Sequence, residues 1–384
     1  MDPILGDCSL ARLRARTSEK WRTHPDDVLP AFVAEMDFDP AEPIKDAVRA
    51  VLAAGDLGYP HKGQLGEAFA EFAADRLGGW SPDPDLIFAT PDVMTGITEI
   101  VRAITPPGGG VVINPPVYPP FFFRLEQADR RVVEAPLVHA EDGSYDVDID
   151  RLDRVLAEPG VGAYLLCSPH NPVGRVWSRD QLGAIAEACD RHGVPVLVDE
   201  IHAPLVLPGS EHIPFHTLDH AAVRRAIVFT SASKGWNIPG LKCGVAIAGD
   251  AAGAAMLAER EDALLASLVG VHAAVAAFRD ARPWLDAVVA QIEANARLLS
   301  KLLAEQLPGV RYRRPQASFL AWLDCRDLEL GDDPAAEFLA RGRIALSPGR
   351  DFGSEGLGFA RLNIGTSPEL ITEAVSRMAS AVSG

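Results

Sequence analysis

Short apolar runs alternate with helical patterns between residues 45 and 270 of the chain. Most of these runs are apolar on both faces, which is typical of strands in a parallel sheet covered on both sides. They are LIFAT (86–90), GVVINPP (110–116), AYLLCSP (163–169), VPVLVDE (194–200), AIVFTSASK (226–234) and CGVAIAG (243–249). Repeated β-α-β units of this kind predict an open α/β sheet.

The helical patterns predict a second domain after this sheet. One helix is expected at residues 178–193, with Ser178 as its N-cap and Gly193 as its C-cap. Two stretches rich in Ala, Leu, Glu and Arg follow residue 255 and predict long helices that cross to the second domain. The tail mixes strand and helix patterns. We therefore expect a large domain at residues 45–270, and a smaller α+β domain built from residues 1–44 together with 271–384.

Composition narrows the class of protein. A length of 384 residues exceeds the usual limit for one core, and 48% hydrophobic with 23% charged residues is ordinary for a globular chain. A net charge of −17 argues against binding to nucleic acid or to an anionic membrane surface. We find no signal peptide pattern and no apolar run that approaches a membrane span. The five scattered cysteines suit reduced thiols in a cytoplasmic protein, and they predict no metal site.

Two residues at predicted strand ends carry the chemistry. Ligands of open α/β sheets bind outside the carboxyl ends of the strands, where Asp199 and Lys234 stand. A buried carboxylate needs a cation or a donor, and a desolvated lysine can act as a Schiff-base nucleophile. Taken singly, Asp199 could cap the next element, a role that suits Glu200 better, and Lys234 could be a solvated lysine. Together they are the pair that pyridoxal phosphate needs, an imine partner and an acid for the pyridinium nitrogen.

An ordered set of motifs resembles a known family. The motifs are SPHNPVGRVW (168–177), VDEIH (198–202), SASKGWNIPGLKCG (231–244) and RLNIG (361–365). They resemble fold-type I pyridoxal phosphate enzymes, and more narrowly the cystathionine β-lyase and C–S lyase branch of the class I/II aminotransferases. The resemblance runs from residue 32 to the end of the chain. It implies the PLP-transferase fold, a large domain with a mostly parallel seven-stranded sheet flanked by helices and a smaller α+β domain.

The resemblance implies roles for the residues that hold the cofactor ring and the substrate. Lys234 forms the link to the cofactor aldehyde, and Asp199 pairs with the pyridine nitrogen. Asn171 donates to the phenolic oxygen and contacts the substrate. Tyr118 stacks on the ring, although it could instead be a core aromatic residue. Arg361 binds the substrate carboxylate with two parallel hydrogen bonds, although it could also form an internal ion pair.

A second group of residues is implied at the cofactor phosphate. Val93 and Met94 open a helix, and backbone N–H groups at a helix N-terminus bind phosphate. The preceding acid, Asp92, is unfavourable beside a phosphate, so the amides are expected to carry this contact. Ser231 and Ser233 are candidate hydroxyl donors, and the family pattern favours Ser231.

Three further residues depart from the aminotransferase pattern or extend it. Lys242 stands where aminotransferases usually carry an arginine, so it would give the phosphate a point charge without a bidentate contact, or else be a solvated lysine. Tyr59 matches a tyrosine that reaches the phosphate of the neighbouring subunit, which implies a homodimer with shared sites. His202 stands where aminotransferases commonly have a tyrosine, and it could equally be a core histidine.

Family features favour elimination over transamination. His202, Trp177 and the early AEMDF motif (34–38) are typical of the lyase branch. Lys234 can serve as both base and acid if its pKa is lowered towards neutrality. We therefore expect a C–S β-lyase of sulfur amino-acid metabolism that cleaves cystathionine or a related L-cysteine S-conjugate to thiol, pyruvate and ammonia. The alternatives are an L-amino-acid aminotransferase and a cofactor-bearing regulatory or binding protein without significant turnover.

Overall fold

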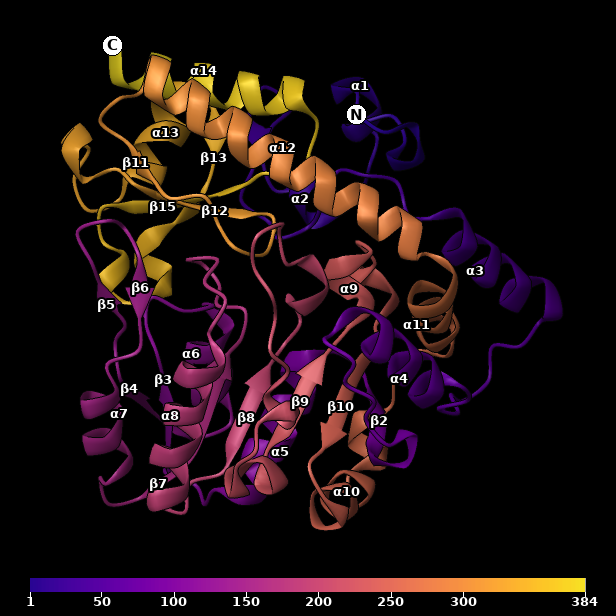
Figure 1. Cartoon of the computed structure of the whole chain (residues 1–384). Helices are drawn as coiled ribbons and strands as arrows, with labels where there is room; N and C mark the ends of the chain where they lie inside the picture. Colours follow the sequence, from indigo (N-terminus) through magenta and orange to yellow (C-terminus); the bar gives the residue numbers. More distant parts are fainter. Residues whose placement is uncertain (384) are drawn as a thin grey trace.

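The computed structural model describes residues 1–383 and is built around a central seven-stranded sheet (Figure 1). In spatial order the strands are β2 (Ile87–Thr90), β10 (Gly244–Ala248), β9 (Ile227–Thr230), β8 (Val196–Asp199), β7 (Val161–Cys167), β3 (Gly110–Ile113) and β4 (Arg131–Glu134). Five strands, from β9 to β4, run parallel, and β10 is antiparallel to both β9 and β2. The expected mostly parallel α/β sheet is confirmed.

Alternating side chains of this sheet pack into two separate apolar clusters. In β3, Val111 and Ile113 belong to one cluster and Val112 to the other. This explains why the runs are apolar on both faces, since helices cover each side of the sheet. On one side α5 (Val93–Ile104) lies so close that a Cβ on Gly96 would come within 2.8 Å of the Phe229 ring.

Further helices surround the large sheet or, like α3, pack on a neighbouring helix. They are α3 (Glu42–Ala54), α4 (Leu65–Arg76), α6 (Pro120–Gln127), α7 (Ile149–Leu156), α8 (Arg179–Arg191), α9 (Ala232–Gly235), α10 (Ala251–Ala258) and α11 (Leu268–Asp280). As expected, Ser178 caps α8, where it forms a capping box with Gln181. The helix ends at Arg191, and Gly193 follows with a φ of +67°.

A smaller four-stranded antiparallel sheet lies above the large one in Figure 1. Its strands are β11 (Arg311–Tyr312), β12 (Leu320–Asp324), β15 (Phe359–Asn363) and β14 (Ser347–Pro348). The helices α13 (Pro334–Gly342) and α14 (Pro368–Ser383) pack beside it. The long helix α12 (Arg282–Gln306) runs from the end of α11 to this sheet, as the sequence predicts.

The N-terminal segment lies on the same side of the molecule as the small sheet. It contains α1 (Leu10–Leu13), α2 (Glu19–Arg22) and β1 (Leu29–Pro30), which pairs in parallel with β13 (Ile344–Ala345). A short hairpin of β5 (Val138–His139) and β6 (Tyr145–Asp146) reaches up from the large sheet. No helix within residues 1–383 has both the length and the apolar character needed to cross a bilayer.

Two elements differ from the sequence prediction. The first long stretch after residue 255 is divided between two helices, α10 and α11, because residues 259–267 form a turn, a 3₁₀ helix at Glu261–Leu264 and an extended link. The edge strand β4 was not predicted, since it is only four residues long and has charged residues at both ends. The proposed boundaries of the two domains stay a prediction.

Candidate active site

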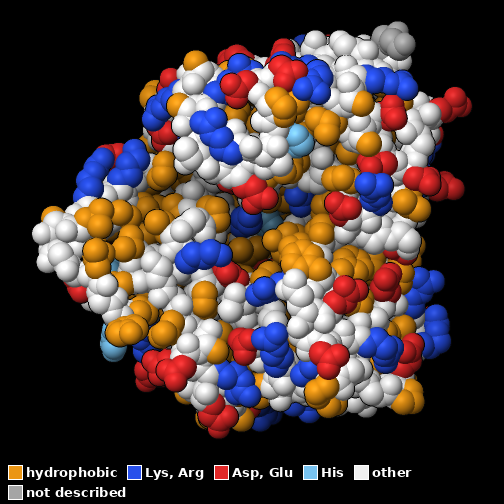
Figure 2. Space-filling model, turned by 180° about the vertical axis from the view of Figure 1, so that it is seen from behind, with side chains coloured by type: hydrophobic (Ala, Val, Ile, Leu, Met, Phe, Trp, Pro, Cys, Tyr) orange, Lys and Arg blue, Asp and Glu red, His pale blue; other side chains and the backbone are white. Residues whose placement is uncertain are grey.

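A cavity of about 400 Å³ opens at the carboxyl ends of the parallel strands. Nine of the residues singled out from the sequence line it together: Val93, Met94, Tyr118, Asn171, Asp199, His202, Ser233, Lys234 and Lys242. The face drawn in Figure 2 is hollowed at mid-height, with basic and histidine side chains deep in the hollow and hydrophobic side chains around it. The topology thus gathers side chains that are scattered over 150 residues of sequence.

Lys234 lies on the short helix α9, directly after β9. Ser231 caps this helix by accepting the N–H of Ser233 at 3.0 Å. The Lys234 Nζ donates a hydrogen bond of 2.6 Å to the carbonyl oxygen of Ala34. Burial, and secondly the nearby charge of Arg361, lower the pKa of Lys234 to about 8. A lowered pKa increases the fraction of neutral amine, the form that attacks an aldehyde.

Asp199 ends β8 at the floor of the cavity and is 4% exposed. Its Oδ1 accepts the N–H of Ile201 at 3.0 Å, and its other oxygen has no donor among residues 1–383. Burial raises the pKa of Asp199 to about 7, although the Ile201 N–H and Lys234 both oppose the rise. A protonated ring nitrogen would give this carboxylate the cationic partner it lacks, so the pair of residues fits a pyridinium ring.

Glu200 serves the structural role that the sequence suggested for it. It is buried, and its carboxylate turns away from the cavity to contact His212 Nε2 at 3.1 Å and to accept the N–H of Phe215 at 2.8 Å. The two consecutive acids thus have different roles, Asp199 at the cavity and Glu200 in the protein interior.

Arg361 reaches the site from β15 of the small sheet and contacts Asn171. Its Nη1 donates to Asn171 Oδ1 at 3.1 Å, and its Nη2 donates to the carbonyl of Phe32 and to the Ser347 hydroxyl. No carboxylate within residues 1–383 lies at ion-pair distance from it, and its buried Nε has no acceptor. Burial lowers its pKa to about 10. A buried guanidinium without an acid fits an incoming carboxylate, and the contact with Asn171 places it beside the cavity.

The first turn of α5 forms a cup at the cavity wall. Asp92 is the N-cap, and its side chain accepts the N–H of Thr95 at 2.8 Å. The amides of Val93 and Met94 remain for a ligand, because the first N–H groups of a helix have no intrahelical acceptor. This is the arrangement that the sequence predicts for a phosphate.

The hydroxyl groups and the lysine of this cup differ from the expectation. Ser231 is buried and donates to the carbonyl of Cys243 at 2.7 Å, so Ser233 is the serine that lines the cavity. Lys242 forms an ion pair of 3.0 Å with Asp92. Burial alone would raise the pKa of Asp92, but the Thr95 N–H and Lys242 together hold it below the ordinary value.

Of three further predicted residues, Tyr118 and His202 line the cavity and Tyr59 lies outside it. Tyr118 lines the cavity, and burial raises its pKa to about 12. His202 also lines it, and burial lowers its pKa to about 3, so the imidazole stays neutral at physiological pH. Tyr59 does not line this cavity; it is 92% exposed on the surface of the chain.

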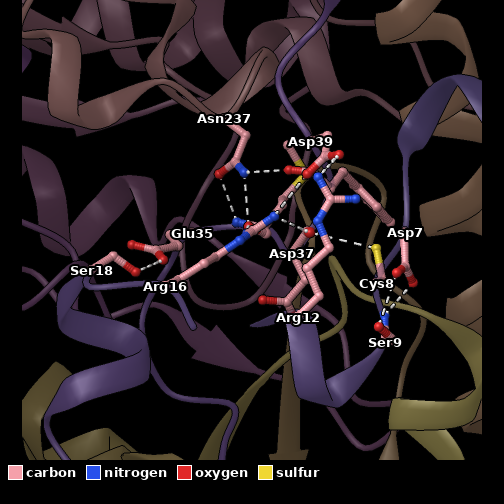
Figure 3. Close-up of polar contacts among 12 residues, drawn as sticks. Asp7, Cys8, Ser9, Arg12, Arg16, Ser18, Glu35, Asp37, Asp39 and Asn237 are labelled. Carbon is pink, nitrogen blue, oxygen red and sulfur yellow. Dashed lines mark hydrogen bonds and ion pairs between the residues drawn. The ribbon is translucent and has the colours of Figure 1, made fainter. Parts of the chain in front are cut away.

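The N-terminal segment forms one wall of the site, which the sequence did not reveal. Its backbone carbonyls at residues 32–36 accept hydrogen bonds from Lys234, Arg361 and Asn363 of the site and the small sheet, and from Asn237 of the large-sheet side. Figure 3 shows Asn237 on one side of this segment and a network of Arg12, Arg16 and acidic side chains on the other. Such contacts use main-chain atoms, so they cannot be predicted from the residue types in the sequence.

The segment is anchored by a buried ion pair. Lys20 Nζ lies 2.8 Å from Asp37 Oδ1, and the two side chains are 1% and 3% exposed. Trp21 also donates its indole N–H to Asp37 at 3.2 Å, and Arg16 donates to the carbonyl of the same residue at 2.8 Å. The wall is therefore fixed by a fully buried ion pair and by further polar contacts around it.

Comparison with known proteins relates the chain to one family over nearly its whole length. Residues 35–378 match the family described as Aminotransferase class I and II. The cystathionine beta-lyase PatB of Bacillus subtilis is 36% identical, and the match covers 93% of each chain. The cystathionine beta-lyase of Corynebacterium glutamicum is 31% identical over 97% of this chain and 98% of its own. Cystalysin from Treponema denticola, solved with a pyridoxal 5'-phosphate cofactor, superposes with a TM-score of 0.90 at 28% identity, covering 95% of both chains.

Proposed function

The chain belongs to the aminotransferase class I and II family, and on that basis we propose that it is a pyridoxal phosphate-dependent C–S β-lyase. Its substrate is cystathionine or a related L-cysteine S-conjugate. The enzyme cleaves it, with consumption of one water molecule, to a thiol, pyruvate and ammonia. One observation carries the proposal. A lysine of lowered pKa and a strand-end aspartate without a cationic partner line the same cavity.

The cofactor and the residues of the cavity would have separate roles in the reaction. Bound pyridoxal phosphate supplies the electron sink for the carbanion at the substrate Cα. Asp199 would hold the ring nitrogen protonated, and the Tyr118 side chain would contact the cofactor ring. Val93 and Met94 would donate their backbone N–H groups to the phosphate at the N-terminus of α5.

Lys234 moves the protons of the reaction. With its pKa lowered to about 8, a substantial share of its Nζ is neutral near physiological pH and can accept the Cα proton. The same Nζ, once protonated, can deliver that proton to the departing sulfur, so the thiol leaves as a neutral group. The Ala34 carbonyl, which accepts from Nζ at 2.6 Å, would hold the protonated amine on the side of the N-terminal wall.

Arg361 and Asn171 position the substrate. The planar guanidinium offers two parallel N–H groups to the α-carboxylate, and its Nε is already free of protein partners. Since Arg361 comes from the small sheet and Asn171 follows β7 of the large one, a substrate bound by both would bridge the two sheets.

We further propose that two chains form the active unit, in the cytoplasm. Tyr59 is 92% exposed beside Leu57, which is 64% exposed, and exposed apolar groups of this size favour a covered face in a symmetric dimer. In that dimer Tyr59 would reach the cofactor phosphate of the partner subunit. Five buried, free cysteines are typical of a reducing compartment.

The experiment that tests the function is a turnover assay with L-cystathionine and pyridoxal phosphate, in which pyruvate and free thiol are both measured. We expect equal amounts of the two products without any added 2-oxo acid, and none with Lys234→Ala. Amino-group transfer that needs a 2-oxo acid and releases no thiol would identify an aminotransferase instead. Binding of the cofactor with neither reaction would favour a regulatory or binding protein.

A further inference from the structure

Three cationic side chains line the cavity, and two of them already have partners. They are Arg124, Lys234 and Lys242. Lys242 is paired with Asp92 at 3.0 Å, and its side chain is 59% exposed. Lys234 donates to the carbonyl of Ala34. Arg124 alone of the three has no carboxylate or carbonyl partner within residues 1–383.

Arg124 lies beside the first turn of α5. It belongs to α6, and its Nη2 donates to Thr95 Oγ1 at 3.3 Å. Thr95 is in that first turn and donates its N–H to Asp92 at 2.8 Å. The guanidinium of Arg124 is therefore held against the same helix turn whose amides, at Val93 and Met94, face the cavity. Its Nε is buried and has no hydrogen-bond acceptor.

The arginines that line another hollow of the described residues all have acid partners, unlike Arg124. A larger hollow of about 490 Å³ lies between the β5–β6 hairpin and the small sheet, and three arginines line it. Each of them is paired with an aspartate: Arg311 with Asp327, Arg313 with Asp142, and Arg326 with Asp324. The positive charges of this second hollow are thus neutralised by acidic side chains of the protein. The cup at α5 is not neutralised in this way, because the half-buried Arg124 has no acid partner and its buried Nε has no acceptor.

The charges of the cup indicate which cation serves the anion. Lys242 and Asp92 neutralise one another, so the pair adds no net charge where the phosphate would sit. Arg124 supplies the remaining positive charge, in the planar form that suits a phosphate. We propose that Arg124 is the guanidinium partner of the cofactor phosphate, the role that sequence analysis gives to Lys242. This inference rests on the proposed function, because it requires the cofactor that function uses.

The test measures the affinity for pyridoxal phosphate itself. Apo-enzyme is titrated with the cofactor, bound and free cofactor are separated by equilibrium dialysis, and the Kd is compared among variants. Arg124→Gln removes a charge-assisted contact, so we expect its Kd to rise about tenfold or more. Arg124→Lys retains the charge but lacks the planar, two-pronged geometry of the guanidinium, so its Kd should lie between those of Arg124→Gln and the wild type.

Two further variants serve as references. Asp92→Asn combined with Lys242→Gln removes one charge of each sign, and we expect a smaller rise in Kd than for Arg124→Gln. Arg154→Gln removes an exposed arginine on α7 that has no ion pair within residues 1–383, so its Kd should match the wild type. Thermal unfolding of each apo-protein shows whether a variant is folded. If Arg124→Gln is not, the Kd of Arg124→Lys against the wild type decides in its place.

The results that overturn the inference are distinct from those that overturn the function. A wild-type Kd for both Arg124 variants would contradict the role at the phosphate. So would a larger loss of affinity in the Asp92, Lys242 double variant than in Arg124→Gln. A rise confined to the KM for substrate, with the cofactor Kd unchanged, would move Arg124 to the substrate and equally overturn the inference. A wild-type chain that takes up no pyridoxal phosphate would instead overturn the proposed function together with it.

Discussion

The Nζ of Lys234 donates a 2.6 Å hydrogen bond to the carbonyl oxygen of Ala34, a residue 200 positions earlier in the chain. One partner lies on α9, the short helix that follows the buried strand β9, and the other lies in the N-terminal segment. The contact shows that this segment is part of the active-site wall. The way the segment is anchored should therefore affect catalysis as well as stability.

Removing the buried anchor of the wall should destabilise the fold. Lys20→Met leaves Asp37 as an unpaired carboxylate in a site where the two side chains are 1% and 3% exposed. We expect the free energy of unfolding to fall by about 3–5 kcal/mol, as for other broken buried ion pairs. Urea denaturation followed by circular dichroism measures the change.

Lys45→Met is the matched control for this prediction. Its pair with Glu42 is at the surface, where the side chains are 34% and 60% exposed, so the loss should stay below about 1 kcal/mol. Adding Asp37→Leu to Lys20→Met should recover much of the lost stability, since no unpaired charge then remains. Equal stability of the wild type and the Lys20→Met variant would show that the pair does not anchor the wall.

The covalent attachment of the cofactor should depend on pH through Lys234. Burial lowers its pKa to about 8 from an ordinary 10.5, and only the neutral amine attacks the aldehyde. The neutral fraction grows as the pH rises through about 8 and is nearly complete above it. Stopped-flow absorbance of apo-enzyme mixed with pyridoxal phosphate should show a rate that is half-maximal near this pH and levels off about one pH unit above it. A rate that continues to rise towards pH 10.5 would indicate a lysine of ordinary pKa.

Arg361→Gln tests the site of the substrate carboxylate. The change removes two charge-assisted hydrogen bonds, so kcat/KM should fall roughly a hundredfold or more, mainly through KM. The cofactor Kd should stay at the wild-type value, because Arg361 is assigned to the substrate alone. With an analogue that lacks the α-carboxylate, the wild type and the variant should be equally slow. An unchanged kcat/KM with lowered stability would give Arg361 a structural role only.

Mixed dimers test whether Tyr59 completes the partner's site. Tyr59→Phe weakens cofactor binding at both sites of a homodimer, and Lys234→Ala makes both sites inactive. A dimer with one subunit of each kind has one site with both native residues. After the two proteins are mixed and exchange subunits, activity at limiting pyridoxal phosphate should exceed that of either protein alone. No gain after verified exchange would place Tyr59 outside the partner's site.

The strand pattern could be predicted because both faces of the sheet are buried. Six of the seven large-sheet strands appear as apolar runs, and their ends supply Asp199 and Lys234. The seventh, Arg131–Glu134, is a short edge strand whose exposed ends are charged, so it has no such run. Apolar runs therefore identified the other edge strand, β2, which has no charged residue, and missed β4, whose exposed ends are charged.

Contacts made by the main chain or across the sheet could not be predicted. The Ala34 carbonyl would be present whatever its side chain, and the pairing of Lys242 with Asp92 depends on the antiparallel register of β10 and β2. The sequence left Lys242 as a point charge for the phosphate or a solvated lysine, and it did not predict the pairing with Asp92. Arg124 follows three phenylalanines, and the sequence alone does not say that its guanidinium meets Thr95.

The most direct test of the account is to locate the covalent link of the cofactor. The enzyme is incubated with pyridoxal phosphate, reduced with borohydride to fix the carbon–nitrogen bond, digested and analysed by mass spectrometry. We predict a single modified peptide that carries the cofactor on Lys234. Modification of a different lysine, such as Lys242, or of none, would contradict the assignment of the active site.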